Sequence, residues 1–297
     1  TMATAMRLYQ GERLYADVFE FYPPGSFYLV AAIFSVFGTS YFAAKVATLL
    51  LTLATAWALD RIVARFCPRG WYRMAALALW VAMLPLVPLV NHNHYAQLAS
   101  IWAVWALLEA YDRRRLDWWA VAGALAGVTG LMLQTRGAAM VLVGAFALLA
   151  SRRLRPTLAY AVGLLASLLP LLVWPLPLLW QHLVVFPARQ YLAPNFLSPR
   201  LLLLAFALMA AIGAAAIVVR PRGRGYWLQW LAAVLILASV SSRADPIHLA
   251  AVAWPLPILY LALLDPLARW SSGVWRMLAT AGAAYVGILA AAVLLGY

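Results

Sequence analysis

Residues 157–180 read TLAYAVGLLASLLPLLVWPLPLLW and contain no charged side chain. A helix needs about 20 apolar residues to cross the hydrocarbon core of a bilayer, and this stretch supplies them. Arg152, Arg153 and Arg155 come just before it. An apolar run that follows a basic cluster is typical of a transmembrane helix that begins on the cytoplasmic side.

Similar apolar runs recur along the whole chain. Of its 297 residues, 66% are hydrophobic and 10% are charged, with a mean hydropathy of +0.87, whereas a soluble domain carries about 25% charged residues. The sequence therefore predicts an all-α fold, a polytopic transmembrane helical bundle of about ten spans. The predicted spans are 40–61, 71–90, 94–111, 117–134, 136–151, 157–180, 201–219, 226–242, 246–265 and 274–296.

Arginine clusters between the spans predict the orientation of the chain, because basic loops stay in the cytoplasm. The net charge of +13 on its own would suit a nucleic-acid binder. However, the arginines stand in short loops between apolar runs, so we expect membrane lipids and no nucleic acid as partners. The single cysteine, Cys67, has no second cysteine with which to form an internal disulfide. The clusters are Arg61/Arg65/Arg69/Arg73, Arg113/Arg114/Arg115, Arg152/Arg153/Arg155, Arg220/Arg222/Arg224 and Arg269/Arg276.

Segment 22–38 is apolar but does not fit as a further span. As a span it would move the arginines at 61–73 to the outside. We therefore expect it to lie along the outer membrane surface as a juxtamembrane helix, opened by Pro23-Pro24 and closed by Gly38. The predicted organisation is an external loop with this helix over 1–38 and a transmembrane bundle over 39–297.

Most of the nine acidic residues sit beside arginines at inner span ends, where interfacial pairing explains them. Three that lack this explanation, Asp17, Glu20 and Asp245, lie on the outer side. Asp17 and Glu20 alternate with aromatic residues, which would hold them against the membrane. A desolvated carboxylate without a cationic partner has a raised pKa and suits a general base.

Polar residues at the outer ends of other spans are further candidates. Arg136 lies in a tight predicted turn, Gln134-Thr135-Arg136, between two apolar spans, and His94 lies at an outer helix end. Arginine binds phosphate through bidentate, charge-assisted hydrogen bonds. The alternative for His94 is an ordinary interfacial histidine.

The stretch SSRADPIH (241–248) places Arg243, Asp245 and His248 together at a helix junction. The functional interpretation is a second phosphate contact from Arg243, and the alternative is a salt bridge that fixes the turn. Asp17, Glu20 and a histidine are chemically able to bind a divalent metal, but their spacing is not that of a known metal motif. We therefore predict no cofactor, with a divalent metal left open.

Three stretches resemble one family. They are LYAD (14–17) with YPPG (22–25) and the Phe37-Gly38 that follows, AGVTGLMLQTRGA (126–138), and RADPIH (243–248). Together they resemble bacterial glycosyltransferases of the C superfamily, near the protein O-mannosyltransferases and aminoarabinose transferases. The resemblance runs through nearly the whole chain.

The resemblance implies an enzyme that moves a sugar from a polyprenyl-phosphate donor to an acceptor glycan, lipid or protein. It implies a multi-pass protein of the bacterial inner membrane, with the active site under the first external loop, facing the periplasm. The expected catalytic residues are Asp17 and Glu20. The expected substrate and lipid-phosphate contacts are Tyr22, His94, Gln134, Arg136, Arg243, Asp245 and His248.

Two departures from the family pattern affect these expectations. The family carries an acidic residue, taken as the base, just after a first transmembrane helix, and we expect that helix and acid upstream of residue 1. Asp17 then matches the second acidic position of the loop. Where relatives often have Lys-Gln in the turn, this chain has Gln134 and Arg136.

Two other classes of function remain as alternatives. A transporter or flippase of a lipid-linked or anionic solute would place charges near the middle of the bilayer in broken helices, whereas here the unexplained charges gather at one face. A non-catalytic relative of the glycosyltransferases is the other alternative, since a shared fold does not establish activity.

Overall fold

The computed structural model of the chain describes residues 1–67, 69–84, 89–190, 199–219, 221, 225–241 and 246–267. Regular secondary structure in these ranges is helical, apart from an isolated β-bridge between Leu14 and Val18. The predicted all-α fold is confirmed. The helices are α1 (Met2–Tyr9), α2 (Gly25–Phe37), α3 (Tyr41–Phe66), α4 (Gly70–Met83), α5 (His92–Arg113), α6 (Leu116–Met132), α7 (Gln134–Ser151), α8 (Leu154–Leu168), η2 (Leu169–Val173), α9 (Leu176–Trp180), η3 (Gln181–Val185), α10 (Phe186–Gln190), α11 (Pro199–Val219), α12 (Tyr226–Ala238), α13 (Pro246–Val252) and α14 (Pro255–Leu267).

Three described segments are long and apolar enough to cross a membrane. They are Tyr41–Phe66, Gln134–Ser151 and the continuous Leu154–Val173. Large apolar side chains stand exposed along the last of these, as expected for a helix that faces lipid. The protein is thus a helical membrane protein. The number of spans stays a prediction, and the predicted span 274–296 lies outside the described residues.

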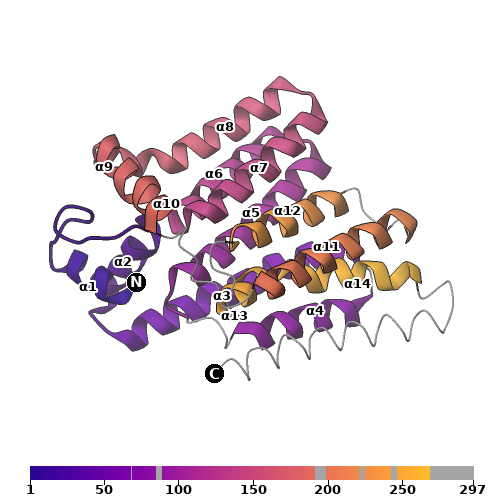
Figure 1. Cartoon of the computed structure of the whole chain (residues 1–297), viewed down its shortest axis with the longest axis horizontal. Helices are drawn as coiled ribbons and strands as arrows, with labels where there is room; N and C mark the ends of the chain where they lie inside the picture. The colour runs from indigo at the N-terminus through magenta and orange to yellow at the C-terminus, as the bar shows by residue number, and fades with distance from the viewer. Residues whose placement is uncertain are drawn as a thin grey trace. The chain divides into compact units, whose positions relative to one another are not determined.

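The chain divides into two compact units (Figure 1). Unit 1 comprises residues 1–58 and 88–195, and unit 2 comprises 59–87 and 196–297. Within unit 2, the Arg73 guanidinium is paired with the Asp60 carboxylate, and Trp230 Nε1 donates to the Met209 carbonyl (3.0 Å).

Unit 1 is organised around close packing between α6 and α8. A Cβ placed on Gly123 would lie 2.0 Å from the Tyr160 carbonyl oxygen, and one on Gly163 would lie 1.9 Å from that of Ala120. Small residues allow two membrane helices to approach at this distance. Gly127, one turn beyond Gly123, meets Ser167 and Leu164 in the same way. Residue numbers rise in the same direction along both helices at this contact, so α6 and α8 run parallel.

This parallel pairing defines the two ends of unit 1. The arginines at the junction of α5 and α6 (113–115) and those at the junction of α7 and α8 (152–155) lie at one end, here called the arginine end. The starts of α5 and α7 lie at the opposite end. Gly25, the first residue of α2, packs there against the end of α6, because its Cβ position is 2.7 Å from the Leu131 carbonyl oxygen. We call this the loop end, after the loop 10–24 that joins α1 to α2.

Charges at the inner span ends are paired as the sequence predicts. Glu109 is bonded to Arg113 one turn further along α5, and Asp117 accepts from Arg115 at 2.7 Å. With Asp60 and Arg73 in unit 2, three of the predicted interfacial pairs are confirmed.

Two segments differ from the prediction. The expected outer turn at residues 134–136 is the first turn of α7, and the extended residue between the helices is Leu133 (φ −158°, ψ 118°). Of these polar side chains Arg136 is buried, Gln134 is half-buried and bonded to Phe21 and Leu183, and Thr135 is exposed. Segment 181–190, expected as loop, is helical. Two Trp-Pro sites inside predicted spans are helix boundaries: Trp174 separates η2 from α9, and Trp254 lies between α13 and α14.

Candidate functional site

The two loop-end carboxylates lie on loop 10–24, which is fixed by its alternating side chains. Leu14, Tyr15 and Val18 are buried, whereas Asp17 and Phe19 are exposed. Tyr15 has a φ of 67°, in the left-handed region, and its N–H donates to the Val18 carbonyl (2.9 Å). This tight turn points the apolar side chains inward and leaves Asp17 at the surface.

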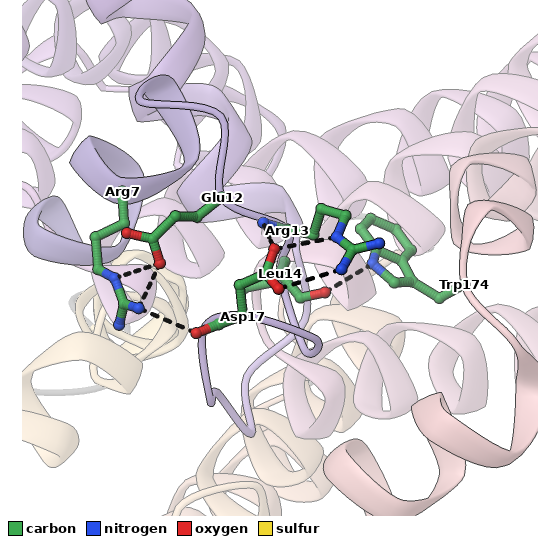
Figure 2. Close-up of polar contacts among 6 residues, drawn as sticks. All are labelled: Arg7, Glu12, Arg13, Leu14, Asp17 and Trp174. Atoms are coloured by element: carbon green, nitrogen blue, oxygen red, sulfur yellow. Dashed lines mark hydrogen bonds and ion pairs between the residues drawn. The ribbon is translucent and has the colours of Figure 1, made fainter.

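Asp17 is held by arginines of its own neighbourhood (Figure 2). Its Oδ2 accepts from the Arg13 N–H (2.8 Å) and Nε (3.0 Å), and its Oδ1 accepts from Arg13 Nη2 (3.2 Å). Arg7, paired with Glu12, donates from Nη2 to the Asp17 carbonyl at 3.0 Å. The Arg13 side chain, and then its backbone N–H, lower the pKa of the Asp17 carboxyl. Asp17 is therefore an ionised, exposed carboxylate with a cationic partner.

Glu20 lies in a different environment, half-buried and joined to two other elements. Its Oε1 accepts from the Thr4 hydroxyl of α1 (2.5 Å). Its carbonyl oxygen lies 2.7 Å from Nδ1 of His182 in η3. The backbone and the carboxylate of Glu20 are thus each fixed by a separate contact.

Segment 174–190 covers the inner side of the loop. In Figure 1, α9 and α10 lie at the end of α8 that faces the N-terminal loop. Trp174 Nε1 donates to the Leu14 carbonyl at 3.1 Å (Figure 2). The His182 ring lies against Tyr15 and Phe19, with ring centroids 5.1 and 5.2 Å away. Aromatic packing and side-chain donors therefore hold the loop together from this side.

The start of α7 also contacts loop 10–24, through the side chain of Gln134. Gln134 Nε2 donates to the Phe21 carbonyl (3.2 Å) and to the Leu183 carbonyl (3.4 Å). One amide group thereby joins loop 10–24 to η3. Arg136, two residues further along α7, is completely buried.

Tyr22 and His94 complete the predicted residues of unit 1. The Tyr22 ring stacks on His92, the first residue of α5, at 3.8 Å between centroids, and its carbonyl accepts from the Tyr15 hydroxyl (2.8 Å). His94 is completely buried, with its Nε2 3.0 Å from Thr52 Oγ1 of α3.

Of the nine residues predicted for the site, six lie in unit 1 and are positioned around its loop end. They are Asp17, Glu20, Tyr22, His94, Gln134 and Arg136. His248 belongs to α13 of unit 2, and Arg243 and Asp245 lie outside the described residues. Within the described ranges, no three His, Cys, Asp or Glu side chains group as metal ligands.

Among the loop contacts that the prediction missed are hydrogen bonds from Thr4, Trp174 and His182. The prolines at 175 and 187 are the sequence signal nearest to two of them. That signal marks helix breaks, but it does not indicate which segment the broken helix faces.

A comparison with protein families matches residues 22–176 to the family described as Dolichyl-phosphate-mannose-protein mannosyltransferase. The match spans more than half of the chain, from Tyr22 to the start of α9. The chain belongs to this mannosyltransferase family. Comparisons with curated proteins and with solved structures give no match.

Membership makes the protein a membrane glycosyltransferase of the C type, in agreement with the resemblance drawn from the sequence. The region matched to the mannosyltransferase family contains Tyr22, His94, Gln134 and Arg136. Asp17 and Glu20 lie just before it.

Proposed function

We propose that this mannosyltransferase-family protein transfers a sugar from a polyprenyl-phosphate donor to an acceptor hydroxyl at its loop end. The observation that carries the proposal is the placement of two carboxylates, Asp17 and Glu20, on a loop held by η3 and by Gln134 of α7, the helix that also carries the buried Arg136. By the positive-inside rule this end faces the periplasm of a bacterial inner membrane, since the arginine end faces the cytoplasm.

Glu20 is the better general base of the two carboxylates. It accepts from a neutral hydroxyl, whereas Asp17 is bonded to Arg13, and a cationic partner weakens a carboxylate as a base. In the proposed step the acceptor oxygen forms a bond to the sugar C1 and gives its proton to Glu20. The bond from C1 to the phosphate oxygen breaks, and its electron pair leaves with the lipid phosphate.

Arg136 would stabilise the negative charge that develops on the leaving phosphate. Gln134 contributes indirectly, because its amide nitrogen is committed to the carbonyls of Phe21 and Leu183. Asp17 would contact the hydroxyls of the acceptor or donor sugar. Phosphate binding by Arg243, with Asp245 and His248 beside it, stays a prediction from the sequence.

The test uses the full-length protein in lipid nanodiscs with a polyprenyl-phosphate-mannose donor. Release of polyprenyl phosphate is measured by mass spectrometry, and binding of polyprenyl monophosphate is measured by native mass spectrometry. We expect turnover in the wild type, weaker phosphate binding in Arg136→Ala and in Arg243→Ala, and unchanged binding in Glu20→Gln. Binding that is equal in all four proteins would remove the phosphate assignment, and binding without turnover would favour a transporter or a non-catalytic relative.

A further inference from the structure

Three backbone carbonyls of loop 10–24 accept hydrogen bonds from side chains that are remote in sequence. Trp174 bonds to the Leu14 oxygen, His182 to the Glu20 oxygen and Gln134 to the Phe21 oxygen. The three oxygens lie within eight residues of loop, so they fix its path on both sides of Asp17. Because the bonds are to the backbone, the two carboxylates stay available for other contacts.

The shape of segment 174–190 accounts for two of these contacts. Trp174 precedes Pro175 and is extended (φ −105°, ψ 145°), because proline disfavours the helical conformation in the residue before it. Pro187 has no N–H, so the Leu183 carbonyl lacks its usual helical donor. The helix widens to a π-turn over Gln181–Val185, a form that is frequent at functional sites. His182 lies in this turn.

The contact between His182 and Glu20 fixes the state of the imidazole ring. A carbonyl oxygen only accepts, so Nδ1 of His182 carries the hydrogen. The ring is buried, with 9% of the residue exposed, and lies against Tyr15 and Phe19. Its orientation is therefore set by packing as well as by the hydrogen bond.

We propose that His182 is a positioning residue for sugar transfer. It holds the backbone of Glu20 so that the carboxylate stays in place to accept the hydrogen bond from Thr4. The proposal rests on the proposed function for its catalytic meaning. Its structural content, the order of loop 10–24, can be measured separately.

The decisive comparison uses three substitutions that differ in the position of one donor. In His182→Asn the amide nitrogen stands where Nδ1 stands, in His182→Gln it stands one bond further out, and His182→Ala has none. We expect kcat to fall about 100-fold in His182→Ala, as for a misplaced catalytic group, with the KM for donor unchanged. His182→Asn should recover most of the loss and His182→Gln should not.

Gln181→Ala is the matched control, since Gln181 is an exposed residue of the same π-turn. Its kcat should equal that of the wild type. Equal rates for the Asn, Gln and Ala variants would overturn the positioning role, because general destabilisation does not depend on where the donor stands.

Hydrogen–deuterium exchange of the amides at 13–22, measured on the full-length protein in nanodiscs, needs no turnover. We expect faster exchange in His182→Ala and wild-type exchange in His182→Asn. If the variants show this exchange pattern but the wild type transfers no sugar, the role of His182 in ordering loop 10–24 stands and the proposed function fails. If exchange is the same in all variants, His182 does not order loop 10–24, whatever the activity.

Discussion

The two ends of unit 1 both carry local ion pairs, such as Arg13 with Asp17 at the loop end, but the structure joins remote segments through side-chain hydrogen bonds to the loop backbone at the loop end. At the arginine end, Arg113 pairs with Glu109 and Arg115 with Asp117, and the partners in each pair are at most four residues apart. At the loop end, His182 and Glu20 are separated by 162 positions, Trp174 and Leu14 by 160, and Gln134 and Phe21 by 113. Local pairs need only a helix, whereas the remote contacts exist only when the whole unit has folded. The remote hydrogen bonds hold the backbone of loop 10–24 in one position, and for this reason we place the proposed reaction at the loop end.

The largest effect should come from Glu20→Gln. Loss of the general base should lower transfer about 1000-fold, with the unfolding temperature unchanged, because the amide oxygen still accepts from Thr4. Glu12→Gln is the control in the same loop, and its transfer rate should equal that of the wild type. If Glu20→Gln kept its transfer activity, Glu20 would not be the base, and the loop end would lose its proposed catalytic role.

Gly25→Ala should loosen the loop end through sterics. The added Cβ would lie 2.7 Å from the Leu131 carbonyl oxygen, and such overpacking costs about 1–3 kcal/mol of unfolding free energy. Gly130→Ala is the matched control, because a Cβ added to Gly130 would lie 3.6 Å from Gly137 Cα, an ordinary van der Waals distance. Thermal unfolding in nanodiscs distinguishes them, and equal stability of the two variants would contradict the close α2–α6 contact.

Trp174→Phe removes one N–H and keeps an aromatic ring. The buried Leu14 carbonyl loses its donor, and a bond of this kind contributes about 1 kcal/mol. We expect faster amide exchange at 13–18 and a transfer rate lower by about fivefold. Trp180→Phe, at an exposed position on α9, should leave both unchanged. A similar response in the two variants would argue against the Trp174 contact.

The smallest effect on stability should come from the two exposed ion pairs, one at each end. Hydrogen bonds from Arg13 lower the pKa of the Asp17 carboxyl. A lowered pKa in the folded state stabilises the protein above the ordinary carboxyl pKa, and this contribution is lost as the pH falls through the lowered value. Asp17→Asn and Asp117→Asn should therefore leave the unfolding temperature at pH 7 almost unchanged.

Sugar transfer separates the same two variants. It should fall in Asp17→Asn and stay at the wild-type rate in Asp117→Asn, since only Asp17 lies at the proposed site. If both variants transfer sugar at the wild-type rate, Asp17 has no part in the reaction.

The sequence was most informative where apolar runs alternate with arginines. The arginine clusters at 113–115 and 152–155 lie at helix junctions, because a basic cluster marks the end of an apolar run. It was misleading at 134–136, where polar side chains indicate a turn although the residues form the first turn of α7, with Arg136 buried and Gln134 bonded to remote carbonyls. The carboxylates could be found from their location, but the contact of His182 with Glu20 depends on two segments meeting in space, and no local pattern encodes that.

The amide nitrogen of Gln134 donates hydrogen bonds to two chain segments, one to the Phe21 carbonyl and one to the Leu183 carbonyl. Deamidation would replace that nitrogen by oxygen and leave the shape of the side chain unchanged. Two attractive contacts with carbonyl oxygens would become two repulsive ones. Deamidation of this one side chain would thus remove the hydrogen bond of α7 to the loop and its hydrogen bond to η3 together, while the bond between His182 and Glu20 stayed in place.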